Sequence, residues 1–127
     1  MAGRRKTAKV AAGKTSADEA LAERRARVVK AIRRLPAGSV SSYGAIARAA
    51  GWPGAARQVV RILQEVEGLP WHRVVGSGGA VKLRGEDGAE QRFRLRMEGV
   101  TFRGARVDMR KHEFRFQIGK RARSQKK

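Results

Sequence analysis

The sequence contains no cysteine among its 127 residues, and this absence excludes several kinds of chemistry. Without a thiol, the chain can form no disulfide, no thiolate zinc site and no adduct on a cysteine nucleophile. Histidine is almost as scarce, because only His72 and His112 are present. We therefore expect no metal site, and no motif in the sequence calls for a cofactor.

Long hydrophobic runs are also missing. No apolar stretch approaches the roughly 20 residues that a membrane-spanning helix needs. The N-terminus is basic, but no hydrophobic segment follows it, so we expect no secretory signal. The sequence thus predicts a cytoplasmic protein that does not use a membrane as its partner.

Acidic residues are few, with 11 Asp and Glu against 30 Lys and Arg, which gives a formal net charge of +19. A protein this basic usually binds a polyanion, because binding releases condensed counterions. The charge by itself does not separate DNA from RNA or an anionic membrane. If the partner is DNA, we expect a nucleoid-associated monomer.

The positive charge is concentrated at both ends of the sequence. Residues 1–15 and residues 119–127 each contain five basic side chains and no acidic one. We interpret both segments as disordered basic tails that add affinity for phosphates. Hydrophobic residues make up 41% of the sequence, so residues 16–118 are expected to form one domain.

The first predicted helix begins at Ser16, which starts a capping box that Glu19 completes. It ends before Pro36 and Gly38. Its apolar residues fall on one helical stripe, and the arginines lie mostly off that stripe, on what we interpret as a solvated face. The stripe consists of Leu21, Val28, Ile32 and Leu35.

Two short helices with a tight turn between them are predicted next. The first is capped by Ser41 or Ser42 and closed by Gly51, and Trp52-Pro53-Gly54 forms the turn. The second runs from Ala55 to about Val66. This arrangement fits a helix-turn-helix, and an ordinary helical hairpin fits it equally well. The second helix is expected to face inward with Val59, Ile62, Leu63 and Val66.

The C-terminal half of the domain combines a small β wing with another helix. The β-prone stretches 72–75 and 80–83 flank the glycines of 76–79, which predicts a hairpin or an irregular wing. A helix over 87–98 spaces Ala89, Phe93 and Met97 by four residues, and a short strand pair follows over 100–109. The fold class is therefore mainly α, a helix-turn-helix or winged-helix-like single domain with a small β wing and basic disordered tails.

The most informative motif is Pro-Trp-His-Arg-Val-Val at residues 70–75. Taken alone, Trp71 is typical of a core residue and His72 of a structural histidine. Together with segments 35–47, 55–59 and 98–100, however, the motif resembles the DNA-binding domain of O6-alkylguanine-DNA alkyltransferases over about residues 27–109. Active members of that family carry Pro-Cys-His-Arg, in which cysteine accepts the alkyl group. Tryptophan at the cysteine position is the signature of the alkyltransferase-like proteins.

The resemblance implies DNA damage recognition without repair, because an indole cannot replace a thiolate nucleophile. An alkylated guanine must leave the base stack to be recognised. By similarity, Tyr43 would press on the phosphate beside the target, although it could simply be an aromatic residue at a helix cap. Arg57 would fill the vacated space in the duplex, although a plain phosphate contact also suits it.

The resemblance also assigns the remaining site residues. Ala55, Ala56 and Gln58 accompany Arg57 on a helix-turn-helix that enters the minor groove, where small residues permit close approach to the backbone. Trp71 would form a wall of the base pocket, and the backbone of Val74 and of residues 82–85 would contact the base edge. Two further roles concern residues farther along the chain. Arg84 would lie near the modified O6 or clamp a phosphate, and His72 and Glu98 would support the pocket.

The resemblance further implies that the bound lesion is marked for nucleotide excision repair. One departure from the family is the loop at residues 65–69, which lacks the asparagine that active relatives often carry before the Pro-Cys motif. Two other functions remain possible on the residues alone. The protein could be a general basic architectural DNA- or RNA-binding protein without lesion preference, or an enzyme that uses another nucleophile.

Overall fold

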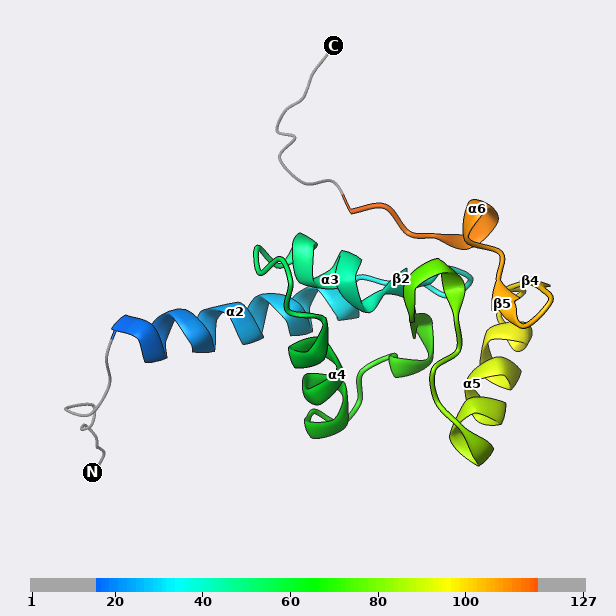
Figure 1. Ribbon diagram of the computed structural model, residues 1–127, viewed down its shortest axis with the longest axis horizontal. Helices are drawn as coiled ribbons and strands as arrows, with labels where there is room; N and C mark the ends of the chain where they lie inside the picture. Colours follow the sequence, from blue (N-terminus) through cyan, green and yellow to red (C-terminus); the bar gives the residue numbers. More distant parts are fainter. Residues whose placement is uncertain (1–15, 117–127) are drawn as a thin grey trace, which may run out of the picture.

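The computed structural model describes residues 16–116, and the long helix α2 (Ser16–Arg33) begins this part of the chain. Helices dominate, as the sequence predicted, and two small two-stranded sheets complete the fold (Figure 1). The predicted basic tails and Ile118 lie outside the described residues. Within residues 16–116, no helix is long and apolar enough to cross a membrane.

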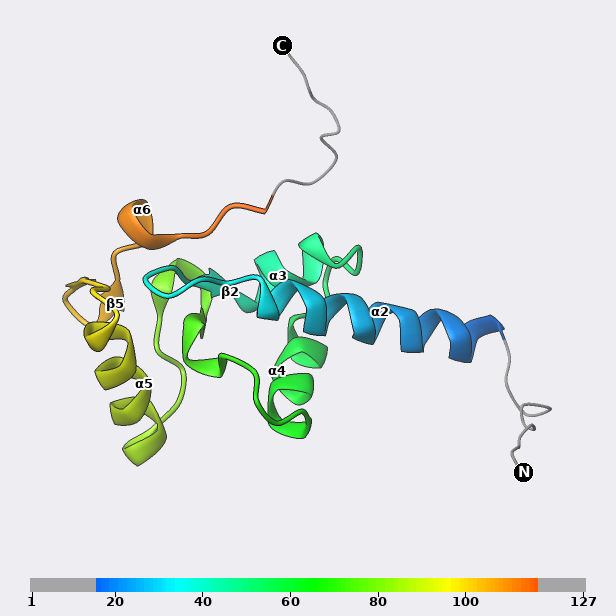
Figure 2. The same ribbon diagram turned by 180° about the vertical axis from the view of Figure 1, so that it is seen from behind.

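The buried side chains of helix α2 all lie in its C-terminal half. Val28 and Ile32 are fully buried, whereas Leu21 is 44% exposed. The prediction that Leu21 shares the buried stripe is therefore wrong. Both views in Figures 1 and 2 show the reason, because the N-terminal half of α2 extends past the neighbouring helices. Helical periodicity identifies a stripe, but only tertiary contacts bury it.

Helices α3 (Tyr43–Ala49) and α4 (Ala56–Glu65) form the predicted pair with a tight turn. The Ser42 hydroxyl caps α3 by accepting a hydrogen bond from the amide of Ala45 at 3.1 Å. The chain then reverses at Gly51 and Gly54, whose φ values of +74° and +83° favour glycine. Both helices pack on the C-terminal half of α2, and the three helices enclose the larger hydrophobic core.

A short parallel sheet separates this core from a second one. Strand β2 (Ser41–Ser42) pairs with β3 (Val74–Val75). Successive side chains of a strand point to opposite faces. Val74 accordingly joins the helical core, and Val75 joins a smaller cluster with Leu95 and Val107. The sheet thus fixes the segment just before it, the 3-10 helix η1 (Trp71–Arg73), against both cores.

The predicted hairpin between residues 72–75 and 80–83 does not form. The segment adopts the alternative prediction, an irregular wing. Strand β3 pairs with β2, so it does not pair with residues 80–83. The 3-10 turn η2 (Ser77–Gly79) follows β3. The amide of Gly76 donates to the carbonyl of Ala80 at 2.7 Å, and Ala80 forms a bridge with Arg106. The glycines of this segment therefore shape a packed turn.

Helix α5 (Gly85–Met97) does not bury the face that carries Ala89, Phe93 and Met97. Gln91 and Leu95 are buried, whereas Phe93 is 59% and Met97 is 72% exposed. The reason is that α5 packs against η1 and β3, where the Gln91 side chain bonds to backbone carbonyls. Ala89, Phe93 and Met97 do lie on one face of the helix, but this face is exposed to solvent.

The remaining elements close the smaller core. Strands β4 (Phe102–Arg103) and β5 (Arg106–Val107) form the predicted antiparallel pair. A single helical turn, α6 (Met109–His112), follows and returns the chain toward β2, where Val40 bridges Glu113. The last described residues pack on the helical core through Phe114 and Phe116, whose rings meet edge to face at 4.9 Å.

Candidate functional site

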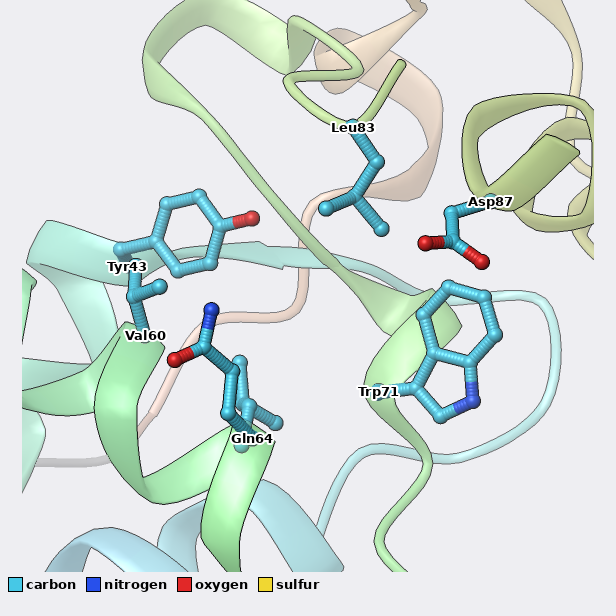
Figure 3. Close-up of a pocket in the computed structure, with 7 residues that line it drawn as sticks. Tyr43, Val60, Gln64, Trp71, Leu83 and Asp87 are labelled. Atoms are coloured by element: carbon cyan, nitrogen blue, oxygen red, sulfur yellow. The ribbon is translucent and has the colours of Figure 1, made fainter. Parts of the chain in front are cut away.

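A cavity of about 270 Å³ opens between the helix-turn-helix and helix α5. Figure 3 shows Tyr43 of α3 and Trp71 of η1 on opposite sides of this space, with Gln64 of α4 beside them. Leu83 of the wing and Asp87 of α5 lie on a third side. The walls are mainly apolar, and the full lining is Tyr43, Val60, Leu63, Gln64, Trp71, Leu83 and Asp87.

Tyr43 reaches the cavity because it is the first residue of α3, immediately after the Ser42 cap. Its ring is partly buried, and burial raises the pKa of the phenol above its usual value of 10.0. The hydroxyl is therefore neutral at physiological pH. It can donate or accept a hydrogen bond at the cavity without adding a negative charge.

Trp71 is held in place from several directions. Its backbone amide donates to the carbonyl of Leu69 at 2.7 Å. The indole meets the ring of His72 edge to face, with centroids 6.2 Å apart. The guanidinium of Arg94 lies over the indole, 5.5 Å from the ring centroid. A half-buried ring held in this way forms a fixed, flat wall.

Behind Trp71, the Glu98 carboxylate forms the centre of a polar network. Nε2 of His72 lies 2.7 Å from Oε2 of Glu98, and Nη2 of Arg73 donates to the same oxygen at 2.7 Å. Nε of Arg73 donates to the other oxygen at 3.0 Å, and the Gly38 amide does so at 3.1 Å. Arg73 also donates to the carbonyl of Leu35 at 2.9 Å. The predicted pair His72–Glu98 thus exists, and Arg73 joins it.

These contacts determine the protonation state of Glu98. Burial alone raises the pKa of the carboxyl, but the hydrogen bonds from Arg73, His72 and Gly38 outweigh burial and lower the pKa from 4.5 to about 2. An ionised carboxylate only accepts hydrogen bonds, so Nε2 of His72 is the donor. The opposite ring atom, Nδ1, is buried and has no hydrogen-bond partner among residues 16–116.

Gln91 supports the same region from α5. Its Nε2 donates to the carbonyl of His72 at 3.1 Å and to that of Val74 at 2.8 Å. Both carbonyls end up inside the fold, where an unpaired acceptor would destabilise the native state. Val74 itself is 1% exposed and does not line the cavity, so its side chain belongs to the helical core.

The predicted arginines lie on the surface around the cavity and do not line it. Arg57 and Gln58 are exposed on the first turns of α4, and Arg84 is exposed just before α5 begins. Ala56 is half-buried, and Ala55 is only 3% exposed. The small side chain of Ala55 therefore serves packing between helices, since it lies in the helical core.

Leu83 lies in the segment 82–85 that the resemblance places at the base edge, but four other lining residues were not assigned to the site, namely Val60, Leu63, Gln64 and Asp87. Helical spacing could have identified the three on α4, because they follow Arg57 at intervals of three and four residues. No comparable signal marks Asp87. It reaches the cavity because the irregular wing carries the chain back beside η1.

Neither histidine belongs to a metal site in the part of the chain that the structure describes. Residues 16–116 contain no group of three or more His, Asp or Glu side chains that could hold a metal ion. Both ring nitrogens of His112 are occupied. Nε2 accepts from the amide of Thr101 at 3.0 Å, and Nδ1 lies 3.2 Å from the carbonyl of Gly38.

The arrangement is suited to binding a flat ring. Two aromatic side chains face each other across an apolar space, and the polar groups at its edge are an amide and a carboxylate. Arg57 in the first turn of α4 and Arg84 just before α5 are both exposed. The chain carries no thiol, so the cavity holds no nucleophile of the kind that accepts an alkyl group.

Comparison with known proteins agrees with this geometry. The family model of the 6-O-methylguanine DNA methyltransferase DNA-binding domain matches residues 23–100. The DNA base-flipping protein of Escherichia coli K12 is 40% identical over 94 residues, which cover 71% of this chain and 73% of that protein. Alkyltransferase-like protein 1 of Schizosaccharomyces pombe is 40% identical over 75 residues, which cover 57% and 69% of the two chains.

Solved structures give the same result. The crystal structure of S. pombe Atl1 in complex with damaged DNA containing O6-carboxymethylguanine superposes with a TM-score of 0.63 and 32% identity over 75% of this chain and 97% of that one. The Mycobacterium tuberculosis protein OGT in complex with DNA gives a TM-score of 0.52 at 36% identity, over 58% of this chain and 48% of that one. This chain therefore belongs to the family of the 6-O-methylguanine DNA methyltransferase DNA-binding domain, as one of its alkyltransferase-like members.

Proposed function

We propose that this protein is a non-enzymatic DNA-damage sensor, which binds O6-alkylguanine flipped out of a DNA duplex and holds the base in the cavity between Tyr43 and Trp71. The observation that carries the proposal is the position of Trp71. It occupies the place of the alkyl-accepting cysteine and forms a wall of the cavity, in a chain without any cysteine. The names of two relatives, a base-flipping protein and an alkyltransferase-like protein, support it.

Stacking inside the cavity would offset part of the free energy that base flipping costs. Extrusion of a nucleotide costs a few kcal/mol, and a weakened base pair such as one with O6-alkylguanine costs least. Stacking of a base on an aromatic side chain returns about 1–3 kcal/mol. A cavity of about 270 Å³ lies at the small end of ligand sites, which suits one base better than a larger ligand.

The exposed arginines complete the proposed complex. Arg57 is placed at the start of α4, so it would enter the duplex and fill the space that the base leaves, or contact a phosphate there. Arg84 precedes α5 at the rim and would approach either the modified O6 or a phosphate. Tyr43 would press on the backbone beside the target. Ala56 and Gln58 lie beside Arg57, on the helix that would enter the minor groove.

The lesion would stay chemically unchanged in this complex. Transfer of an alkyl group requires a strong nucleophile close to the alkyl carbon, and Trp71 offers none. His72 and Glu98 remain paired at 2.7 Å, but Arg73 engages the same carboxylate. In our proposal these residues shape the wall behind Trp71 and take no part in proton transfer. The bound lesion would then be marked for nucleotide excision repair.

The central test is a binding titration of the full chain with two duplexes that differ in one base, guanine or O6-methylguanine, at the same salt concentration. We expect at least tenfold tighter binding of the lesion. Equal affinities would contradict the proposal and would favour a general architectural DNA-binding protein. Such a protein would also lose affinity steeply with salt on both duplexes alike.

Absence of alkyl transfer is tested separately by mass spectrometry. After incubation with duplex carrying O6-methylguanine, the protein mass should stay unchanged, and the DNA should keep its methyl group. A methyl group on any protein atom, or a repaired guanine, would show that the chain is an enzyme with another nucleophile.

A further inference from the structure

Asp87 is the only charged side chain among the seven residues that line the cavity. It lies in the first turn of α5. Figure 3 shows its carboxylate between Leu83 and the indole of Trp71, on the cavity side. Acidic residues are common in the first helical turn, where they offset the helix dipole, and Glu86 also meets that need here. The dipole thus explains an acid in this turn, but not its place in the cavity wall.

The charge of Asp87 is not balanced by a neighbouring cation. Within residues 16–116, no salt bridge or side-chain hydrogen bond engages its carboxylate. The guanidinium nearest to Trp71, that of Arg94, is already paired with Glu90, because its Nε donates to Oε2 of Glu90 at 2.6 Å. Arg84 is exposed and does not line the cavity.

The position of Trp71 indicates which part of a flipped base Asp87 would meet. In alkyl-transferring members of the family, the position that Trp71 occupies in this chain holds the cysteine that accepts the O6 substituent. The substituent of a bound base therefore points toward Trp71, and the Asp87 carboxylate lies beside the same ring. A neutral alkyl group can pack there. The side chain of Asp87 is itself exposed at the edge of the cavity. A negatively charged substituent would be placed near this second negative charge, and the two would repel each other across a partly solvated gap in which salt screens the repulsion.

We infer that Asp87 makes this pocket selective for neutral O6 substituents, such as methyl or hydroxyethyl, over anionic ones such as carboxymethyl. This inference rests on the proposed function, since it concerns the lesions that the same cavity accepts. It also distinguishes the chain from S. pombe Atl1, whose crystal structure contains O6-carboxymethylguanine. Because the cavity opens to solvent, we expect a discrimination on the order of tenfold at low salt.

The test compares lesions of matched size. The full chain is titrated with duplexes that carry guanine, O6-methylguanine, O6-(2-hydroxyethyl)guanine or O6-carboxymethylguanine in one sequence context. Hydroxyethyl and carboxymethyl have the same length and differ in charge, so their affinity ratio isolates the electrostatic effect. We expect the hydroxyethyl lesion to bind about tenfold more tightly at low salt, with a smaller ratio as salt rises.

Three variants assign the effect to Asp87. In Asp87→Asn the ratio should fall close to one, mainly through stronger binding of the carboxymethyl lesion. Asp87→Ser removes the same charge and keeps a side chain that suits a helix start, so it repeats the test if the asparagine variant is poorly folded. Glu86→Gln is the matched control, because it removes the same charge from the neighbouring exposed position outside the cavity lining. It should keep the wild-type ratio.

The possible outcomes are distinguishable. Equal binding of the hydroxyethyl and carboxymethyl lesions by the wild-type chain would overturn the inference and leave lesion recognition intact. A ratio that persists in Asp87→Asn, or that falls equally in Glu86→Gln, would also overturn it. Equal binding of guanine and all three lesions would instead overturn the proposed function, and the inference with it.

Discussion

The guanidinium of Arg94 lies over the indole of Trp71, 5.5 Å from the ring centroid. A cation in this position is attracted to the face of an aromatic ring, and the attraction helps to fix the orientation of the ring. Arg94 is itself oriented by Glu90, because Nε of Arg94 donates a hydrogen bond to the Glu90 carboxylate at 2.6 Å. Helix α5 thus holds the tryptophan that forms the wall of the cavity.

The Arg94–Trp71 contact predicts that Arg94→Ala weakens lesion binding by about two- to fivefold, in line with a cation–π contact of about 0.5–1 kcal/mol. The loss should be smaller for undamaged duplex, because only the lesion uses the indole. Arg92→Ala removes the same charge from α5 and serves as the control in the same titration. If both variants lose affinity equally on both duplexes, Arg94 contributes only general charge.

Trp71→Ala is expected to remove most of the preference for alkylated guanine. Loss of the stacking surface should weaken lesion binding by a factor of about 5 to 150, which corresponds to about 1–3 kcal/mol. Binding to undamaged duplex depends on surface arginines and should change less than twofold. Trp52→Ala is the comparison, since Trp52 packs against the helical core and lies outside the cavity lining. A retained preference in Trp71→Ala would show that another surface recognises the lesion.

The low pKa of Glu98 predicts a specific loss of stability in acid. The carboxyl has a pKa of about 2 in the folded state against 4.5 for an unperturbed one. The ionised form therefore stabilises the fold, by up to about 3 kcal/mol above pH 4.5. This contribution is lost as the pH falls from 4.5 toward 2.

Urea denaturation at a series of pH values checks the role of Glu98. Glu98→Gln should be less stable at pH 7 and should lose less further stability than the wild type between pH 4.5 and 2.5. Glu67→Gln, at an exposed position, should follow the wild-type curve. Parallel curves for the wild type and Glu98→Gln would contradict the assignment.

The wing depends on a close approach at Gly79. Its φ is +89°, and an added Cβ would lie 2.4 Å from the carbonyl oxygen of Val107. Gly79→Ala should therefore lower the free energy of unfolding by about 3 kcal/mol or more, from backbone strain and overpacking together. Gly104→Ala is the control, since its φ is also positive, at +62°, but nothing lies within 4 Å of the added Cβ. Thermal denaturation should show a cost of about 1 kcal/mol there, and equal costs would argue against the steric contact.

Local sequence signals were sufficient wherever the structure depends on neighbours in the chain. The cap at Ser42, the turn glycines at 51 and 54 and the antiparallel pair after α5 all lie where their patterns predict them. The replacement of cysteine by Trp71 was also visible in the sequence. The cap, the turn and the strand pair each follow from residues within about ten positions of one another.

Long-range contacts decided the rest. The apolar stripe with Phe93 and Met97 faces solvent, because Gln91 on the other side of α5 bonds to carbonyls about 20 residues away in the chain. The strand pairing of Val74–Val75 with Ser41–Ser42 displaced the predicted hairpin. No local sequence pattern determines which face of a helix is buried or which strands pair, since both depend on surfaces brought together by the whole fold.

The sequence by itself excluded thiol chemistry in this protein, because the presence or absence of a cysteine does not depend on folding. Only the tertiary structure decided the surroundings of Trp71. Asp87, Leu83 and Gln64 come from separate segments and meet at one cavity when α4, the wing and α5 pack around η1. The physical reason is that a binding site is formed by side chains close in space, whereas helical and strand periodicity report only on residues close in sequence.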